Sequence, residues 1–305
     1  MDKKKKLQKI NTVTLEEKWR SYLRHPMALV QFLLVHLAAI LTAAVVLFLI
    51  IYILATGLPH IHKELFAWTW TTKNQSMMPA IINTLVMTAL SLLVAVPIGV
   101  GGAIYMVEYA KRGNKLVKLV RLTAETLQGI PSIVYGIFGF VFFNVALGWG
   151  FSLLAGSMTL AIMILPLMLR TTEEALMAVP DAYREGSFGL GAGKLRTVFR
   201  IILPSAMPGV LAGVILSIGR IVGESAALIY TSGSGTGNLA FIKDGSFHLF
   251  APLFQSTRTL SVHMYALMNE GLYTDQAHAT AVVLMVLVIG LNALSAFAAK
   301  KLTKQ

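Results

Sequence analysis

Six long apolar runs constrain this chain more than any other feature of its sequence. A helix needs about 20 mostly apolar residues to cross the hydrocarbon core of a bilayer. Of the 305 residues, 56% are hydrophobic and 13% are charged, whereas charged residues make up about 25% of a soluble globular chain. The sequence therefore predicts an all-α fold, a polytopic membrane helical bundle with six transmembrane helices. The predicted spans are residues 29–54, 81–106, 126–147, 153–170, 205–230 and 277–299.

The first span and the connections between spans suggest how the chain is organised. The apolar core of a cleaved signal peptide is only about 7–15 residues long, so we interpret 29–54 as a retained span. We expect residues 1–28 to form a cytoplasmic tail and residues 29–305 to form one transmembrane domain. Two connections are longer than simple turns, a cytoplasmic one at 171–204 and an extracytoplasmic one at 231–276.

The basic residues gather on one side of the predicted membrane topology. Of the 26 Lys and Arg residues, 21 fall in the two tails and in the loops after the second and fourth spans, and four in the other loops. Because basic residues accumulate in cytoplasmic loops, both termini are predicted to be cytoplasmic. The predicted topology accounts for the net charge of +12, so this charge does not indicate nucleic-acid binding. We expect the chain to contact membrane lipid. The absence of cysteine excludes thiolate metal sites and thiol nucleophiles.

The cytoplasmic connection 171–204 has the pattern of a helical hairpin. A first helical segment should stop at Pro180, and Asp181 can cap a second one. Three glycines then break the pattern, and a third helical segment, 195–203, should end at Pro204. That third segment carries apolar residues at i, i+3, i+4, i+7 and i+8, which form one face. From these residues alone, the hairpin could pack on its own bundle or dock on a partner.

The same connection contains a misleading glycine pattern. The stretch "GLGAGK", residues 189–194, looks like a phosphate-binding loop. A P-loop requires G-x-x-x-x-G-K followed by Ser or Thr. Phe188 stands where the first glycine is needed, and Leu195 follows the lysine. We therefore expect no cofactor in this chain, and any ATP chemistry must belong to another chain.

The spacing of five residues in this connection resembles a family signature. Importer permeases of the ATP-binding cassette class carry the motif "EAA---G---------I-LP", which is matched by Glu185, Gly191, Ile201, Leu203 and Pro204. The two alanines are replaced by small residues, Gly186 and Ser187. The resemblance implies a type I importer permease fold with a cytoplasmic coupling helix that fits a groove on an ATPase subunit. It also implies two ATPase subunits that bind ATP and Mg²⁺, and no catalytic activity in this chain.

Three further stretches are similar to the phosphate-importer permeases. They are "RTTEEALMAVPDAYREGSFGLGAGK", "LQGIPSIVYGIFG" and "GRIVGESAALIYTSG". The last of these, the short N-terminal tail and "STRTLSVHMYALMNEGL" are closer to the A-type subunit. The resemblance covers roughly residues 75–300. It implies a heterodimer with a C-type permease subunit in the inner membrane, and delivery of inorganic phosphate by an extracytoplasmic binding protein.

The fifth span carries two charges, although a charge at the centre of a membrane helix costs about 2.5–3.5 kcal/mol on insertion scales. Helical spacing places six of its residues on one face: Gly209, Gly213, Ser217, Arg220, Glu224 and Thr231. The small residues allow another helix to pack closely. Arg220 and Glu224 could form a structural ion pair in which each neutralises the other. Alternatively, Ser217, Arg220, Glu224 and Thr231 line the substrate pathway, where Arg220 attracts an anion and Glu224 limits how tightly it binds. The resemblance favours the pathway.

Other assignments remain open from the sequence. The chain could serve an importer of another oxyanion or small solute, because an arginine also suits sulfate or phosphonate. It could also be a secondary transporter or channel, but the coupling-motif spacing argues against a protein that needs no ATPase. Near the start of the third span, Glu125 is predicted to pair with Arg121, four residues earlier on one helix.

Overall fold

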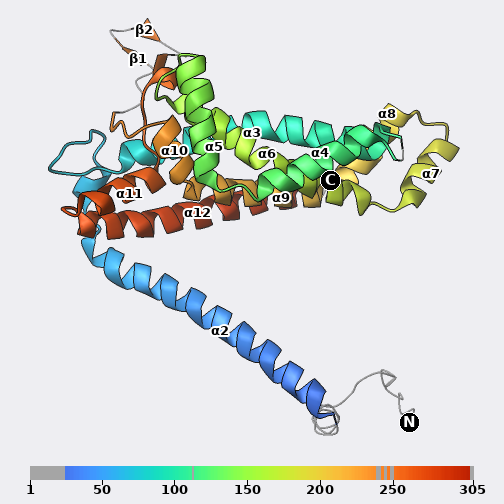
Figure 1. The fold of residues 1–305 in the computed structure, drawn as a ribbon, viewed down its shortest axis with the longest axis horizontal. Helices are drawn as coiled ribbons and strands as arrows, with labels where there is room; N and C mark the ends of the chain where they lie inside the picture. The colour runs from blue at the N-terminus through green and yellow to red at the C-terminus, as the bar shows by residue number, and fades with distance from the viewer. Residues whose placement is uncertain (1–24, 112, 238–241, 244–245, 248–250, 303–305) are drawn as a thin grey trace, which may run out of the picture. The chain divides into compact units, whose positions relative to one another are not determined.

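The computed structural model describes residues 25–111, 113–237, 242–243, 246–247 and 251–302, which are almost entirely helical (Figure 1). The chain divides into two compact units, Met1–Ala55 and Thr56–Gln305. Most of the first unit's described part is α2 (Pro26–Gly57), the helix predicted for the first apolar run. The apolar side chains along α2 are exposed, as expected for a helix surrounded by lipid.

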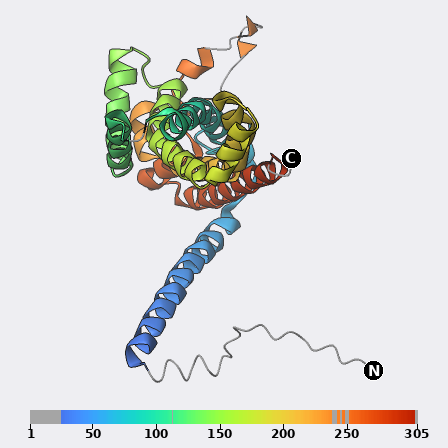
Figure 2. The ribbon, with the colours of Figure 1, turned by 90° about the vertical axis from the view of Figure 1, so that its right-hand side faces the viewer.

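Four helices of the second unit are long and apolar enough to cross a membrane, and each lies where a span was predicted. Figure 1 shows them side by side, and Figure 2 shows them nearly end-on as one bundle. Of these four, α6 is the most buried, packed against α3 and α9. Its Leu160 and Ile164 are fully buried together with Met87 from α3. The four helices are α3 (Met78–Ile104), α6 (Leu153–Met177), α9 (Leu203–Gly223) and α12 (Thr274–Leu302).

The third predicted span, 126–147, is not one straight helix. It is formed by α4 (Lys115–Gln128) and α5 (Ser132–Gly139), and α5 continues as a π-helical stretch, Phe140–Ala146. The two parts meet at an angle of 105°, and Figure 1 shows α5 turning away from the direction of α4. Pro131 stands at the bend, where it can donate no backbone hydrogen bond. In the part of the chain that is described, the membrane helices therefore number five, or six if this bent pair is one span.

The helix that follows the glycine turn does not end at Pro204, so that prediction was wrong. α8 (Lys194–Thr197) continues through a π-helical turn, Val198–Ile202, directly into α9. Pro204 lies in the first turn of α9. The π-helical turn before it changes the hydrogen-bond pattern, so the missing N–H of Pro204 is tolerated there. The hairpin that the sequence predicts to be cytoplasmic is consequently joined to the membrane helix without a break.

The remaining elements are short and lie at the two ends of the bundle (Figure 1). At the end where α8 lies, α7 (Asp181–Gly189) forms the other arm of the helical hairpin. The opposite end holds α10 (Ala226–Thr231), α11 (Leu260–Glu270) and a small antiparallel hairpin, β1 (Ile242–Lys243) and β2 (Ser246–Phe247). α3 is extended by a π-helical turn, and three short 3-10 turns complete the described elements: Tyr105–Tyr109, Leu58–His60, Lys63–Phe66 and Ala251–Phe254.

The predicted close approach of another helix to the small residues of α9 is confirmed. A Cβ atom added at Gly209 would lie 2.5 Å from the Cβ of Ala175 on α6. A Cβ atom at Gly213 would overlap the Oγ1 of Thr171 and lie 3.0 Å from its Cβ. Small residues are enriched at such contacts because they let two backbones approach within van der Waals distance.

A methyl group at position 213 should therefore be costly. We predict that Gly213→Ala lowers the free energy of unfolding by about 1–3 kcal/mol through overpacking. Gly219→Ala is the matched control on the same helix, because no atom of the described residues lies within 4 Å of a Cβ atom there. Thermal unfolding of the purified chain in detergent compares the two variants, and equal stability of both would contradict the close packing of α9 on α6.

Candidate functional site

The fifth span is broken at the charged position that the sequence singled out. α9 ends at Gly223, and Glu224 has an extended backbone, with φ −76° and ψ 127°. α10 starts two residues later, at Ala226. The prediction that Arg220, Glu224 and Thr231 share one continuous helix face was therefore wrong.

Polar groups stabilise this break. The Glu224 carboxylate Oε1 accepts a hydrogen bond from the backbone N–H of Ala227 at 3.0 Å, which satisfies a free donor in the first turn of α10. The Glu224 carbonyl accepts a second bond, at 2.6 Å, from the hydroxyl of Ser261 on α11. Glu224 thus acts as a cap on α10, a role that helical spacing alone does not reveal.

Arg220 stands in the last turn of α9 and is partly exposed. Among the described residues its guanidinium makes no hydrogen bond and no ion pair, so the pairing with Glu224 weighed from the sequence is not formed. Its charge acts on the nearby hydroxyl of Tyr135 from α5, which itself donates to the Leu127 carbonyl at 2.8 Å. A cation at this position is favourable because a helix C-terminus carries partial negative charge.

Ser217 and Thr231, the other two pathway residues predicted from the sequence, are fully buried. The Ser217 hydroxyl donates to the Gly213 carbonyl at 2.9 Å, and the Thr231 hydroxyl donates to the Ala227 carbonyl at 3.0 Å. Both hydroxyls are thus bonded to their own helices. In this conformation Arg220 and Glu224 are accessible, whereas Ser217 and Thr231 pack inside the bundle.

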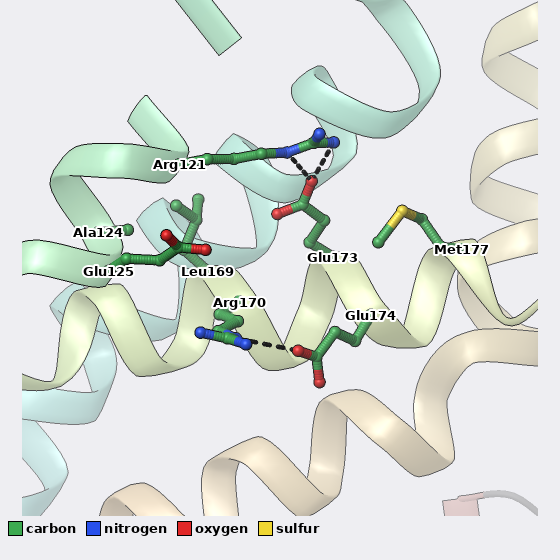
Figure 3. A pocket seen from close by; sticks show the side chains of 8 residues that line it. All are labelled: Arg121, Ala124, Glu125, Leu169, Arg170, Glu173, Glu174 and Met177. Carbon is green, nitrogen blue, oxygen red and sulfur yellow. Dashed lines mark hydrogen bonds and ion pairs between the residues drawn. The ribbon is translucent and has the colours of Figure 1, made fainter. Parts of the chain in front are cut away.

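A charged pocket lies between α4 and α6, on the cytoplasmic side of Arg220 according to the predicted topology (Figure 3). Arg121 on α4 donates to Oε1 of Glu173 on α6 through Nη2, at 2.5 Å, and Nε, at 2.6 Å. On α6, Arg170 Nε lies 3.0 Å from Glu174 Oε1. Figure 3 shows Glu125 in the same pocket, but Arg121 does not pair with it, so that predicted pair was wrong.

The sequence could not identify the Arg121–Glu173 pair because its members lie 52 positions apart. Helical spacing finds only partners on the same helix. The Glu173 side chain is 8% exposed and that of Arg121 is 47% exposed, so the carboxylate is shielded from solvent while the arginine remains partly accessible. Both arginines of the pocket are already neutralised by carboxylates, and an anion there would have to displace one of them.

The coupling-motif residues lie at the end of the bundle that the sequence predicts to be cytoplasmic. Gly186, Ser187, Ile201 and Pro204 line one open hollow between α7 and the start of α9. Glu185 lies exposed on α7. Three apolar or aromatic side chains on α7 and in the turn after it are exposed: Tyr183, Phe188 and Leu190.

Two local features hold the hairpin in shape. The turn after α7 depends on Gly191, whose φ of +80° is strained for any residue with a side chain. The Ser187 hydroxyl lies 2.8 Å from that of Thr197, which ties α7 to α8. Leu203, the remaining motif residue, is partly buried and packs in a cluster with the C-terminal ends of α3 and α6.

At the opposite end of the bundle, Arg258 is buried within the loop before α11. Its Nε donates to the Ser234 carbonyl at 3.1 Å, and its Nη1 lies 3.3 Å from Nδ1 of His263. Its guanidinium also lies 5.7 Å from the centre of the Trp70 ring, a favourable cation–π distance. Arg258 therefore fastens the glycine-rich loop after α10 to α11.

His263 makes the stability of this end depend on pH. Burial, together with the neighbouring Arg258 charge, lowers the pKa of His263 to about 4. In the unfolded chain the pKa is about 6.5. The folded state therefore has its full stability above pH 6.5. That stability is lost as the pH falls towards 4, because His263 takes up a proton at a higher pH in the unfolded chain than in the folded chain.

Between pH 7 and pH 5 we predict a loss of about 2 kcal/mol from the free energy of unfolding. Denaturation of the purified chain at both pH values measures this loss, with His263→Gln as the reference because it cannot titrate. A wild-type chain with the same pH dependence as His263→Gln would contradict the assignment.

Comparisons with known proteins identify the family. Residues 95–304 match the model of the "Binding-protein-dependent transport system inner membrane component" family. Over 267 residues the chain is 34% identical to "Probable ABC transporter permease protein YqgI" of Bacillus subtilis (strain 168), covering 84% of this chain and 89% of the relative. Over 238 residues it is 32% identical to "Phosphate transport system permease protein PstA" of Mycobacterium leprae (strain TN), covering 74% of each.

A solved structure shares the fold. It is a chain of the bacterial alginate ABC transporter in complex with alginate pentasaccharide-bound periplasmic protein, with a TM-score of 0.60 and 20% identity. The match covers 92% of this chain and 98% of the other. Permeases of this family have no catalytic activity, and a partner ATPase hydrolyses the ATP. The chain therefore belongs to the family of binding-protein-dependent transport system inner membrane components, as a multi-pass permease subunit of an ABC importer.

Proposed function

We propose that this permease carries inorganic phosphate, as the A-type subunit of a heterodimer with a C-type subunit. The observation that carries the proposal is the Arg220 guanidinium, which ends a membrane helix without an ion-pair partner among the described residues. A guanidinium presents several N–H donors in a planar fork that matches phosphate oxygens. The similarity to phosphate permeases and the motifs around Arg220 support phosphate as the anion.

The broken fifth span suits such a role. Transport requires a site that binds an anion well enough to admit it and weakly enough to release it. The Arg220 guanidinium attracts the anion. The Glu224 carboxylate, which the backbone N–H of Ala227 holds at the break, is a nearby negative charge that keeps the anion from binding too tightly. Further along, the cations of the α4–α6 pocket are paired with glutamates. An anion leaving Arg220 therefore meets no second unpaired arginine in that pocket.

Energy for transport would enter through the cytoplasmic hairpin. The motif residues on α7 and at the start of α9 would fit one of two ATPase subunits, which bind ATP and Mg²⁺. An extracytoplasmic phosphate-binding protein would deliver the substrate at the opposite end, near α10 and α11. Movement of the hairpin would reach the Arg220 region through α9, because α8 and α9 are joined without a break.

Uptake by cells tests this function. Deleting the gene for this chain should remove high-affinity uptake of radioactive phosphate, and a plasmid copy should restore it, while sulfate uptake stays unchanged. If the deletion instead removed sulfate or phosphonate uptake and left phosphate uptake intact, the substrate assignment would be wrong while the family assignment stood.

A further inference from the structure

Arg184 on the coupling helix α7 is surrounded by hydrogen-bond acceptors. Its Nη2 and Nε donate to Oε1 of Glu108 at 2.7 and 3.1 Å. Nη2 also donates to the Leu176 carbonyl at 3.0 Å, and Nη1 donates to the Val179 carbonyl at 2.8 Å. A last bond, from Nη1 to Oδ1 of Asp181 at 3.1 Å, stays within α7. The guanidinium thereby contacts three separate parts of the chain.

Two of these acceptors, Glu108 and Leu176, belong to the cytoplasmic ends of two membrane helices. Glu108 lies on the π-helical turn that extends α3, and Leu176 lies in the last turn of α6, one residue before its end. The final carbonyls of a helix lack partners within the helix and carry partial negative charge. A cation at this point satisfies them and joins α3 to α6.

Burial distinguishes the bond to Glu108 from the bond to Asp181. The side chains of Arg184 and Glu108 are 17% and 8% exposed, whereas that of Asp181 is 79% exposed. Exposed ion pairs contribute little because water and salt screen them. A buried pair is different, because removing one member leaves an uncompensated charge.

Few other polar bonds hold α7. Among the described residues, its only other side-chain hydrogen bond joins Ser187 to Thr197, within the same hairpin. No further side-chain hydrogen bond in the described chain links α7 to α3 or to α6. Arg184 is therefore the polar connection through which a displacement of α7 reaches these two membrane helices.

We propose that the Arg184–Glu108 pair is a positioning pair that transmits movement of the coupling helix to α3 and α6. The pair does not contact substrate. This inference rests on the proposed function, in which α7 contacts an ATPase subunit, and it assigns the transmission step to two residues that the coupling motif does not include.

The first experiment tests the attachment of α7 without any partner. The chain has no cysteine, so Leu190→Cys, at a side chain that is 91% exposed beside α7, carries a single nitroxide spin label. We expect Glu108→Gln to make this label clearly more mobile in lipid vesicles. Asp181→Asn, the same chemical change at the exposed acceptor, should leave the spectrum unchanged. Equal spectra for Glu108→Gln and the parent would overturn the proposal.

The second experiment tests transmission in the assembled importer. In vesicles with both permeases, the ATPase and the phosphate-binding protein, we expect Glu108→Gln and Arg184→Gln to reduce phosphate transported per ATP by about tenfold or more. Asp181→Asn should change this ratio by less than about twofold. The ATPase should still co-purify with all three variants, because the hollow beside α7 keeps its lining.

The two experiments separate the inference from the proposed function. An unchanged ratio of phosphate to ATP in Glu108→Gln would contradict transmission through the pair. Failure of the parent chain to bind the ATPase or to carry phosphate would contradict the proposed function instead, and the spin-label result would still decide whether Glu108 holds α7.

Discussion

Replacing Arg220 with alanine should reduce phosphate uptake by about 100-fold or more while the permease still reaches the membrane and binds its partners. A charge-assisted contact to a desolvated anion is worth roughly 2–5 kcal/mol when one partner is truncated, and about 2.7 kcal/mol corresponds to 100-fold. The fold should survive, because Arg220 makes no hydrogen bond or ion pair within the described chain whose loss would weaken it. Uptake of radioactive phosphate into vesicles containing the complete importer measures the effect.

Two further variants make the Arg220 result interpretable. Arg220→Lys keeps the charge but loses the planar fork, so we expect it to retain intermediate uptake. Lys73→Ala removes a positive charge from an exposed position at the extracytoplasmic end of the bundle and should leave uptake unchanged. If Arg220→Ala assembled normally and kept more than half of the uptake, Arg220 would not be a pathway residue.

Glu224 requires a separate comparison because it caps α10. In Glu224→Gln the side-chain oxygen can still accept from Ala227, so the cap is kept and only the charge is lost. If the charge limits anion binding, Glu224→Gln should lower the KM for phosphate and slow release. Unchanged kinetics in Glu224→Gln, together with a defect in Glu224→Ala, would assign the residue to the cap alone.

The second large effect is expected at the turn of the cytoplasmic hairpin. Gly191→Leu should reduce the amount of ATPase that co-purifies with the permease by about tenfold or more. A non-glycine residue with a positive φ costs about 1–2 kcal/mol, and the new side chain would project from the hairpin turn, beside the exposed Leu190. Glu185→Lys, which reverses an exposed charge on α7, should weaken ATPase binding without altering the fold.

Gly113 provides a matched control for Gly191. It also has a positive φ, +82°, and no described residue places an atom within 4 Å of a Cβ atom there, but it lies in the turn between α3 and α4. Gly113→Leu should therefore carry the same backbone strain and leave ATPase co-purification unchanged. Equal losses in both variants would attribute the effect to strain and contradict the assignment of the hairpin as the docking element.

The sequence predicted the membrane helices well because their signal is local. Apolar runs of membrane length place α2, α3, α6, α9 and α12, and small residues four positions apart indicated which face of α9 packs closely. The structure differs from the prediction where helices change direction or hydrogen-bond pattern. The 105° bend before α5, the π-helical turn before Pro204 and the break at Glu224 all lie inside apolar stretches. A hydropathy pattern does not predict a change in helix direction or in hydrogen-bond pattern.

The polar contacts were less predictable, because they join distant parts of the chain. Helical spacing suggested pairs four residues apart, yet Arg121 pairs with Glu173, and Glu224 caps α10 in place of binding Arg220. Arg184 was recognisable only as one of the cytoplasmic basic residues, because its partner Glu108 lies 76 positions away. The coupling motif, in contrast, lies within one hairpin, and four of its residues line one hollow.

The proposed role of this permease is to pass phosphate and to couple its passage to ATP hydrolysis on a partner. The most direct measurement is ATP hydrolysis by the purified complex in lipid vesicles, with the phosphate-binding protein added in the presence of either phosphate or sulfate. We expect phosphate-loaded binding protein to stimulate hydrolysis several-fold, with phosphate accumulating in the compartment that contains the ATP, and we expect sulfate to have no effect. Hydrolysis that ignores phosphate, or phosphate entry that proceeds equally without ATP, would contradict it.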